Sequence, residues 1–221
     1  MDGDLTALAA RLAPAVVEHT RALADVSTPS GERDGTERAI ELCASMLPGW
    51  ELERVRCSTA ACAPDLVASR RGSGDRRLLL LGHLDTVVAH HQHRRCEVRG
   101  ERLYGPGTAD MKGGVAVALA LARALSERPE RYAELSVLLV CDEEWRVAPF
   151  AHTERFAHYD ACLCFEAGEL GENGEDAVIV RRKGAGTLRV RAAGRASHSG
   201  SAPHQGRNAL LALAHAAIAG A

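Results

Sequence analysis

The chain alternates between segments in which apolar residues recur with helical spacing and short runs that are mostly apolar. Helical spacing predicts helices at residues 5–25, 35–46, 113–126 and 208–218. The apolar runs predict strands at residues 66–68, 78–81, 135–141 and 161–165. The last two of these runs are typical of strands buried on both faces of a parallel sheet. The alternation of such strands with helices predicts an α/β layered domain with a mostly parallel central sheet.

The pattern changes after the turn-like residues 171–174. Residues 177–182 and 186–193 alternate between apolar and polar side chains, which predicts half-exposed strands. A loop of small and polar residues follows at 194–206, before the last apolar helix. We therefore expect one α/β domain over residues 1–182 and the start of a second, smaller domain over residues 183–221.

Composition and charge add only broad limits. The 221 residues are 46% hydrophobic and 25% charged, with a formal net charge of −2. These values are ordinary for a soluble globular protein, and nothing in them indicates a nucleic acid or a membrane as partner. The N-terminal residues show no secretory signal pattern. The seven cysteines contain no Cys-x-x-Cys pair, and their odd number favours a reducing compartment, so the predicted location is the cytoplasm.

Histidine and acidic residues stand where predicted strands end. His83 follows one apolar run, Glu143 and Glu144 follow the next, and Glu166 follows the last. Ligands of open α/β sheets bind beyond the carboxyl ends of strands, so these side chains are expected to share one cleft. One imidazole with several carboxylates suits a divalent metal ion. Of two adjacent glutamates, one could bind the metal while the other remains a base.

Each of these features also has a plainer interpretation. Asp85, two residues after His83, could orient the imidazole, but a His-x-Asp pair alone is weak evidence. Asp110 follows Gly105-Pro106-Gly107, and on spacing alone it is better explained as a cap for the following helix. An Asp-Glu-Glu sequence is common in solvated loops. The histidines of residues 90–93 lie in a polar, arginine-rich stretch, where a surface loop explains them better than a metal site.

Six motifs in order resemble one family. Residues 81–87 (Leu-Gly-His-Leu-Asp-Thr-Val) resemble the first metal motif of the dinuclear zinc exopeptidases and deacylases, which include carboxypeptidase G, acetylornithine deacetylase, succinyl-diaminopimelate desuccinylase and aminoacylase. Residues 104–114, 142–144 and 166–168 are similar to its next three motifs, and residues 181–184 and 194–200 to the opening of its lid domain. Any one motif is weak, but their order and spacing are specific.

The resemblance implies roles for seven residues. His83 and Glu166 would hold one zinc ion, Glu144 the second, and Asp110 would bridge both, although cobalt or manganese would also suit such ligands. Asp85 would orient His83, and Glu143 would be the general base that takes a proton from a water between the metals. His198 would bind substrate from the lid, across a homodimer interface in many relatives. The substrate would be an N-acyl amino acid or a small peptide, cleaved at an amide bond.

The sequence departs from the family in two places. Bulky residues follow the paired glutamates at positions 145–150, where members usually carry small ones. The family also completes the second metal site with a histidine nearer its C-terminus, and no residue here matches it, so the chain is expected to be a C-terminally incomplete enzyme. Two alternatives stay open. One is a catalytically impaired metal-binding or dimerising remnant, and the other is an α/β domain whose acids are capping and surface groups.

Overall fold

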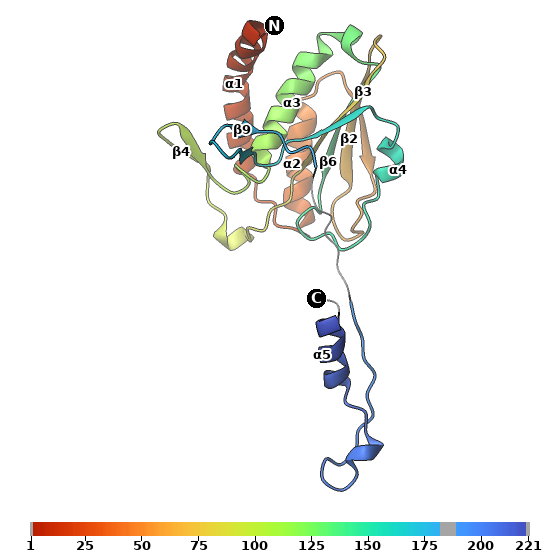
Figure 1. Cartoon of the computed structure of the whole chain (residues 1–221). Helices are drawn as coiled ribbons and strands as arrows, with labels where there is room; N and C mark the ends of the chain where they lie inside the picture. Colours follow the sequence, from red (N-terminus) through yellow and green to blue (C-terminus); the bar gives the residue numbers. More distant parts are fainter. Residues whose placement is uncertain (1, 182–188, 220–221) are drawn as a thin grey trace. The chain divides into compact units, whose positions relative to one another are not determined.

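The computed structural model describes residues 2–181 and 189–219, which divide into two compact units between Ile179 and Val180. The first unit is built on a five-stranded sheet with the order β1-β2-β6-β3-β7 (Figure 1). Its strands are β1 (Glu51–Val55), β2 (Asp65–Arg71), β3 (Arg77–His83), β6 (Glu134–Val140) and β7 (Ala161–Cys164). β2 runs antiparallel to β1 and β6, whereas β3 runs parallel to β6 and β7. The α/β class is confirmed, with a mixed sheet.

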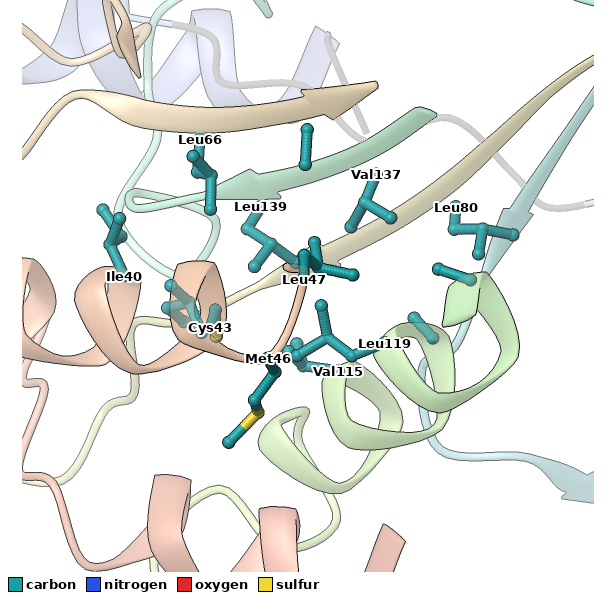
Figure 2. Packing of buried hydrophobic residues seen from close by; sticks show 14 of the residues in the cluster. Ile40, Cys43, Met46, Leu47, Leu66, Leu80, Val115, Leu119, Val137 and Leu139 are labelled. Carbon is teal, nitrogen blue, oxygen red and sulfur yellow. The ribbon is translucent and has the colours of Figure 1, made fainter. Parts of the chain in front are cut away.

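Three helices lie on one face of this sheet: α1 (Asp2–Ala24), α2 (Arg33–Ser45) and α3 (Lys112–Ser126). Figure 2 shows Ile40 of α2 and Val115 of α3 packing toward Leu66, Leu80 and Val137 of the strands. The short helix α4 (Thr153–Phe156) lies on the other side of the sheet (Figure 1). Along the strands, the positions next to those that face the helices point to this other side and form a smaller cluster: Val67, Leu79, Leu138 and Val140. The central strands are therefore buried on both faces.

The burial predicted for residues 161–165 is wrong for most of that run. All four residues of β7 are exposed, and 43% of Leu163 is accessible to solvent. The physical reason is position, because β7 is the edge strand of the sheet and pairs only with β3 among the described strands. Cys162 and Cys164, which lie in this run, are exposed for the same reason.

Short elements connect these layers. Between β3 and α3 lie the 3-10 helix η1 (His90–Gln92) and the hairpin of β4 (Glu97–Arg99) with β5 (Arg102–Tyr104). The 3-10 helix η2 (Pro129–Arg131) precedes β6, and β8 (Glu169–Leu170) pairs with β9 (Asp176–Ala177) after β7. Within the residues that the structure describes, no helix combines the length and hydropathy needed to cross a bilayer.

The second unit contains the 3-10 helix η3 (Pro203–Gln205) and α5 (Ala209–Ala219). An isolated antiparallel bridge pairs Arg195 with Arg207, which lie before and after η3 in the sequence. The strands predicted at 177–182 and 186–193 are wrong for most of the residues that can be compared. Ala177 ends β9, but residues 178–181 and 189–193 are not strands, and positions 182 and 186–188 lie outside the described residues. Alternation alone does not make a strand, because a strand also needs a neighbour to satisfy its backbone hydrogen bonds.

Candidate metal centre

Three predicted ligands come together at the carboxyl edge of the sheet. His83 ends β3, Glu144 lies just after β6, and Asp110 lies just before α3. One donor atom from each lies within 4.8 Å of the other two. Nε2 of His83 is 2.9 Å from Oδ1 of Asp110 and 3.6 Å from Oε1 of Glu166, which follows β7. One imidazole nitrogen and several carboxylate oxygens at such short separations fit a divalent cation.

The close approach of α3 to the end of β7 depends on a glycine. A Cβ placed on Gly114, in the first turn of α3, would lie 1.8 Å from the carbonyl oxygen of Phe165. Only a residue without a side chain lets the start of α3 lie against the residue that precedes Glu166. The peptide bond between Asp110 and Met111 is cis. Gly114 of the sequence motif is explained by packing of α3 against the end of β7, whereas a Cβ on Gly113 would lie 2.3 Å from the carbonyl oxygen of Thr108.

The second ring nitrogen of His83 faces Asp85. Nδ1 lies 3.0 Å from the main-chain oxygen of Asp85 and 3.4 Å from its Oδ1. The nearer acceptor is therefore the main chain, whereas we expected the carboxylate. A carbonyl oxygen can only accept, so Nδ1 carries a hydrogen and Nε2 is directed to the carboxylates.

The carboxylate of Asp85 is buried and has other partners. Its Oδ2 accepts a hydrogen bond from Ser30 Oγ at 2.8 Å. The backbone N–H groups of Glu143 and Glu144 donate to Oδ1 and Oδ2 at 3.0 and 3.2 Å. Asp85 therefore holds the turn that carries both glutamates. Ser30 was not among the predicted site residues, since residues 27–31 were interpreted only as the end of a helix.

Charges at this edge favour a cation. Burial opposes protonation of His83, but the carboxylates of Asp85, Glu166 and Asp110 outweigh it and raise its pKa to about 9. Burial and then the neighbouring Asp110 carboxylate raise the pKa of Glu144. For Asp85, hydrogen bonds from His83 and Ser30 outweigh burial and lower its pKa. Without a metal, the cluster thus favours binding a proton, which is the behaviour expected of a site that lacks positive charge.

A cavity of about 220 Å³ opens beside the cluster. His83, Glu143 and Glu166 line this cavity. Arg146 and Phe150, from the segment after β6, and several apolar residues also line it. Glu143 is exposed, unlike the half-buried Glu144. The two adjacent glutamates therefore differ in position, with Glu144 among the clustered donors and Glu143 at the cavity.

The bulky residues after Glu144 are accommodated by packing. Trp145 lies against Gly31, where a Cβ would be 3.0 Å from its ring. Gly31 has a φ of +85°, so two constraints favour glycine there. The guanidinium of Arg146 lies 4.9 Å from the ring centre of Phe150 and 3.9 Å from Oδ1 of the buried Asp142. Oδ2 of Asp142 accepts a hydrogen bond from the backbone of Thr59.

A buried pair of side chains, His152 and Asp65, stabilises the segment between β6 and α4. His152 is 4% exposed, and its Nε2 lies 2.7 Å from Oδ2 of the fully buried Asp65. Oδ1 of Asp65 accepts the backbone N–H of Cys141 at 2.9 Å. Burial raises the pKa of Asp65 in spite of these hydrogen bonds. The pair joins β2 to both ends of the segment between β6 and α4.

His198, the remaining predicted site residue, belongs to the second unit. Its Nδ1 accepts hydrogen bonds from the backbone N–H groups of Gly200 and Ser201, each at 3.1 Å. An accepting Nδ1 places the hydrogen of the neutral ring on Nε2. The loop therefore presents Nε2–H as a hydrogen-bond donor.

Comparison with known proteins identifies relatives of this arrangement. Residues 79–220 match the model of peptidase family M20/M25/M40. Carboxypeptidase G2 of Pseudomonas sp. (strain RS-16) is 30% identical over 207 residues, which are 90% of this chain and 49% of that protein. Acetylornithine deacetylase of Vibrio atlanticus is 32% identical over 83% of this chain and 48% of that protein. The chain spans about half the length of the curated relatives it matches.

Solved structures show the same fold. A tripeptidase from Staphylococcus aureus superposes with a TM-score of 0.61 at 16% identity, over 93% of this chain and 56% of that one. An M20 family metallo-carboxypeptidase from Sulfolobus solfataricus gives 0.58 at 18% identity, over 72% of this chain and 38% of that one. The family resemblance predicted from the six motifs is confirmed.

Proposed function

The chain belongs to peptidase family M20/M25/M40, and from that premise we propose that it supplies most of the metal site of an amide hydrolase. The substrate would be an N-acyl amino acid or the terminal residue of a small peptide. Carboxypeptidase G2 and acetylornithine deacetylase, its relatives by sequence, support both substrate classes. Because the chain spans about half of their length, the activity is proposed for the whole protein.

The proximity of His83, Asp110 and Glu144 is the observation that carries this proposal. His83 and Glu166 would hold one zinc ion and Glu144 the other, with Asp110 between them. Zinc bound there would act as a Lewis acid toward an amide carbonyl and toward water. Cobalt or manganese would fit the same ligand types.

The chain's own residues would handle the proton. Glu143, exposed at the cavity that His83 and Glu166 also line, would take a proton from water and return it to the leaving amine. Asp85 would keep Glu143 in place through the backbone hydrogen bond that it accepts. Nε2–H of His198 would donate to the substrate oxygen that gains negative charge.

The domain assignment follows the same proposal. Residues 1–182 would form the catalytic domain, and residues 183–221 the opening loop and helix of a lid that mediates dimerisation; the first strand expected there is not found among the described residues. The cytoplasm would be the compartment, because an odd number of cysteines without framework spacing suits reducing conditions.

Metal content and hydrolysis, measured together, test the proposal. The chain would be loaded with zinc, dialysed and assayed for metal per chain, and the same sample tested on N-acyl amino acids and dipeptides. Bound zinc with turnover that Glu143→Gln abolishes, while zinc content stays unchanged, supports the proposal. Zinc binding without turnover supports the metal site and shows that hydrolysis requires more of the protein than these residues. No zinc binding in the wild type, or zinc binding that His83→Ala leaves unchanged, contradicts the site itself.

A further inference from the structure

A groove lies between the first half of α1 and the last turns of α3, which run side by side in Figure 1. Its volume is about 580 Å³, within the range of ~300–1,000 Å³ that is usual for small-molecule sites. Six apolar residues line it: Leu5, Ala7, Leu8, Leu121, Ala124 and Leu125. The groove is far from the candidate metal centre, because Lys112 begins α3 next to Asp110 and Leu121 lies roughly 14 Å further along the helix axis.

Three arginines complete the lining of this groove: Arg11 from α1, Arg128 just after α3, and Arg131 from η2. No acidic residue lines it, although the formal net charge of the chain is −2. Arg11 and Arg128 form no side-chain hydrogen bond or ion pair with another described residue. Arg131 lies 3.8 Å from Glu130, but both side chains are largely exposed, and such surface pairs are weak. The groove therefore combines apolar walls with positive charge that the described residues do not neutralise.

We propose that this groove binds a fatty-acid anion, with the hydrocarbon chain between α1 and α3 and the carboxylate at the arginines. Leu5 is 63% exposed, so a bound chain would remove apolar surface from water, which is favourable in proportion to the area buried. Arginine keeps its charge and donates two parallel hydrogen bonds to a carboxylate. A neutral apolar ligand would not use the arginines, and an inorganic anion would leave the leucines exposed. Only an amphipathic anion satisfies both parts of the lining, and this site does not depend on the proposed hydrolysis.

Calorimetry with carboxylates of increasing length tests the proposal on the wild-type chain. Hexanoate, octanoate and decanoate would be titrated below their micelle-forming concentrations, with octanamide as the uncharged match of octanoate. Affinity should rise about two- to fourfold for each added methylene, where the upper value corresponds to full burial. Octanoate should bind about three- to tenfold more tightly than octanamide, between the effects of an exposed ion pair and a charged hydrogen bond.

Two double variants separate the head group from the chain. Arg11→Gln with Arg128→Gln should remove the preference for octanoate over octanamide and keep the dependence on chain length. Leu5→Gln with Leu8→Gln should weaken the dependence on chain length and keep the preference for the anion. Circular dichroism would show that each variant is folded. The ligand series on the wild-type chain decides the question if a variant fails to fold.

Arg38→Gln with Arg70→Gln is the matched control, because these exposed arginines of α2 and β2 carry the same charge and do not line the groove. This control should bind all four ligands as the wild type does. Equal affinity for octanoate and octanamide, affinity that does not change with chain length, or an equal loss in the control overturns the proposal. Binding to vesicles of phosphatidylglycerol without binding of monomeric decanoate would also overturn it, since the groove would then contact a membrane surface instead.

Discussion

The backbone N–H of Glu143 donates a hydrogen bond to Oδ1 of Asp85 at 3.0 Å, across 58 residues of sequence. Asp85 thus acts on two elements of the proposed centre, the imidazole of His83 and the turn with the two glutamates. A buried carboxylate with several donors is well satisfied, and replacing it leaves those donors without partners. The position of the general base therefore depends on a residue that contacts neither water nor substrate in our proposal.

Asp85→Asn is expected to weaken zinc binding by about ten- to hundredfold, the usual effect of removing a partner that orients metal ligands. An amide has one acceptor oxygen in place of two, so the turn that carries Glu144 loses a hydrogen bond. Competition with a chromophoric chelator would measure the affinity. Asp160→Asn is the matched control, because Asp160 also accepts a backbone N–H, from Arg77, but at the other end of β3. Equal losses of zinc affinity in both variants would contradict the role of Asp85 in holding the metal site.

His152→Ala is expected to lower the free energy of unfolding by about 3–5 kcal/mol, since it leaves the buried Asp65 without its partner. Urea denaturation followed by circular dichroism would measure the change. His158→Ala removes an exposed histidine two residues after the end of α4 and should change stability little. A double variant, Asp65→Ala with His152→Ala, should cost less than the sum of the single variants. Strict additivity would show that the pair does not interact.

The buried thiol of Cys43 is expected to make the free energy of unfolding fall at alkaline pH. Burial raises the pKa of its thiol from 9.0 to about 12. A group whose pKa is raised by folding contributes stability that is complete below its unfolded value and is lost as pH rises toward the folded value. The free energy of unfolding should therefore fall between pH 9 and 12, with about 1.4 kcal/mol per pH unit coming from this thiol. Urea titrations at pH 7.5, 9 and 10 would measure the slope.

Cys43→Ala should lower stability at pH 7.5 but decline less steeply above pH 9. Leu47→Ala truncates a residue of the same cluster that carries no titrating group, so it should shift the whole curve downward in parallel with the wild type. If the Cys43→Ala and Leu47→Ala curves have equal slopes, the buried thiol does not control alkaline stability.

The loop around His198 should fix its tautomer. With Nδ1 accepting from Gly200 and Ser201, neutral His198 is expected to carry its hydrogen on Nε2. Nitrogen-15 chemical shifts of the histidine rings at pH 8 would report the tautomer, with the His198→Gln variant assigning the signal. A hydrogen on Nδ1 would exclude the loop geometry and the proposed donation from Nε2.

The positions of His83 and Glu144 were predictable because the apolar runs that precede them are strong signals. β3 and β6 are buried on both faces, so His83 and Glu144 had to emerge at one edge. The supporting residues were not predictable, since Ser30 and His152 meet their partners across 55 and 87 residues and neither stands in a distinctive pattern. The exposure of β7 was missed for a related reason, because composition does not show which strand is at an edge.

Trp145 gives this site an optical signal. It follows Glu144 directly, lies against Gly31 and is 63% exposed, whereas Trp50, the other tryptophan, is 8% exposed in the core. An indole next to solvent emits at longer wavelength than a buried one, so the two contributions separate spectrally. Fluorescence of a Trp50→Phe variant would then follow metal and substrate arrival at the glutamate turn in real time, without any label.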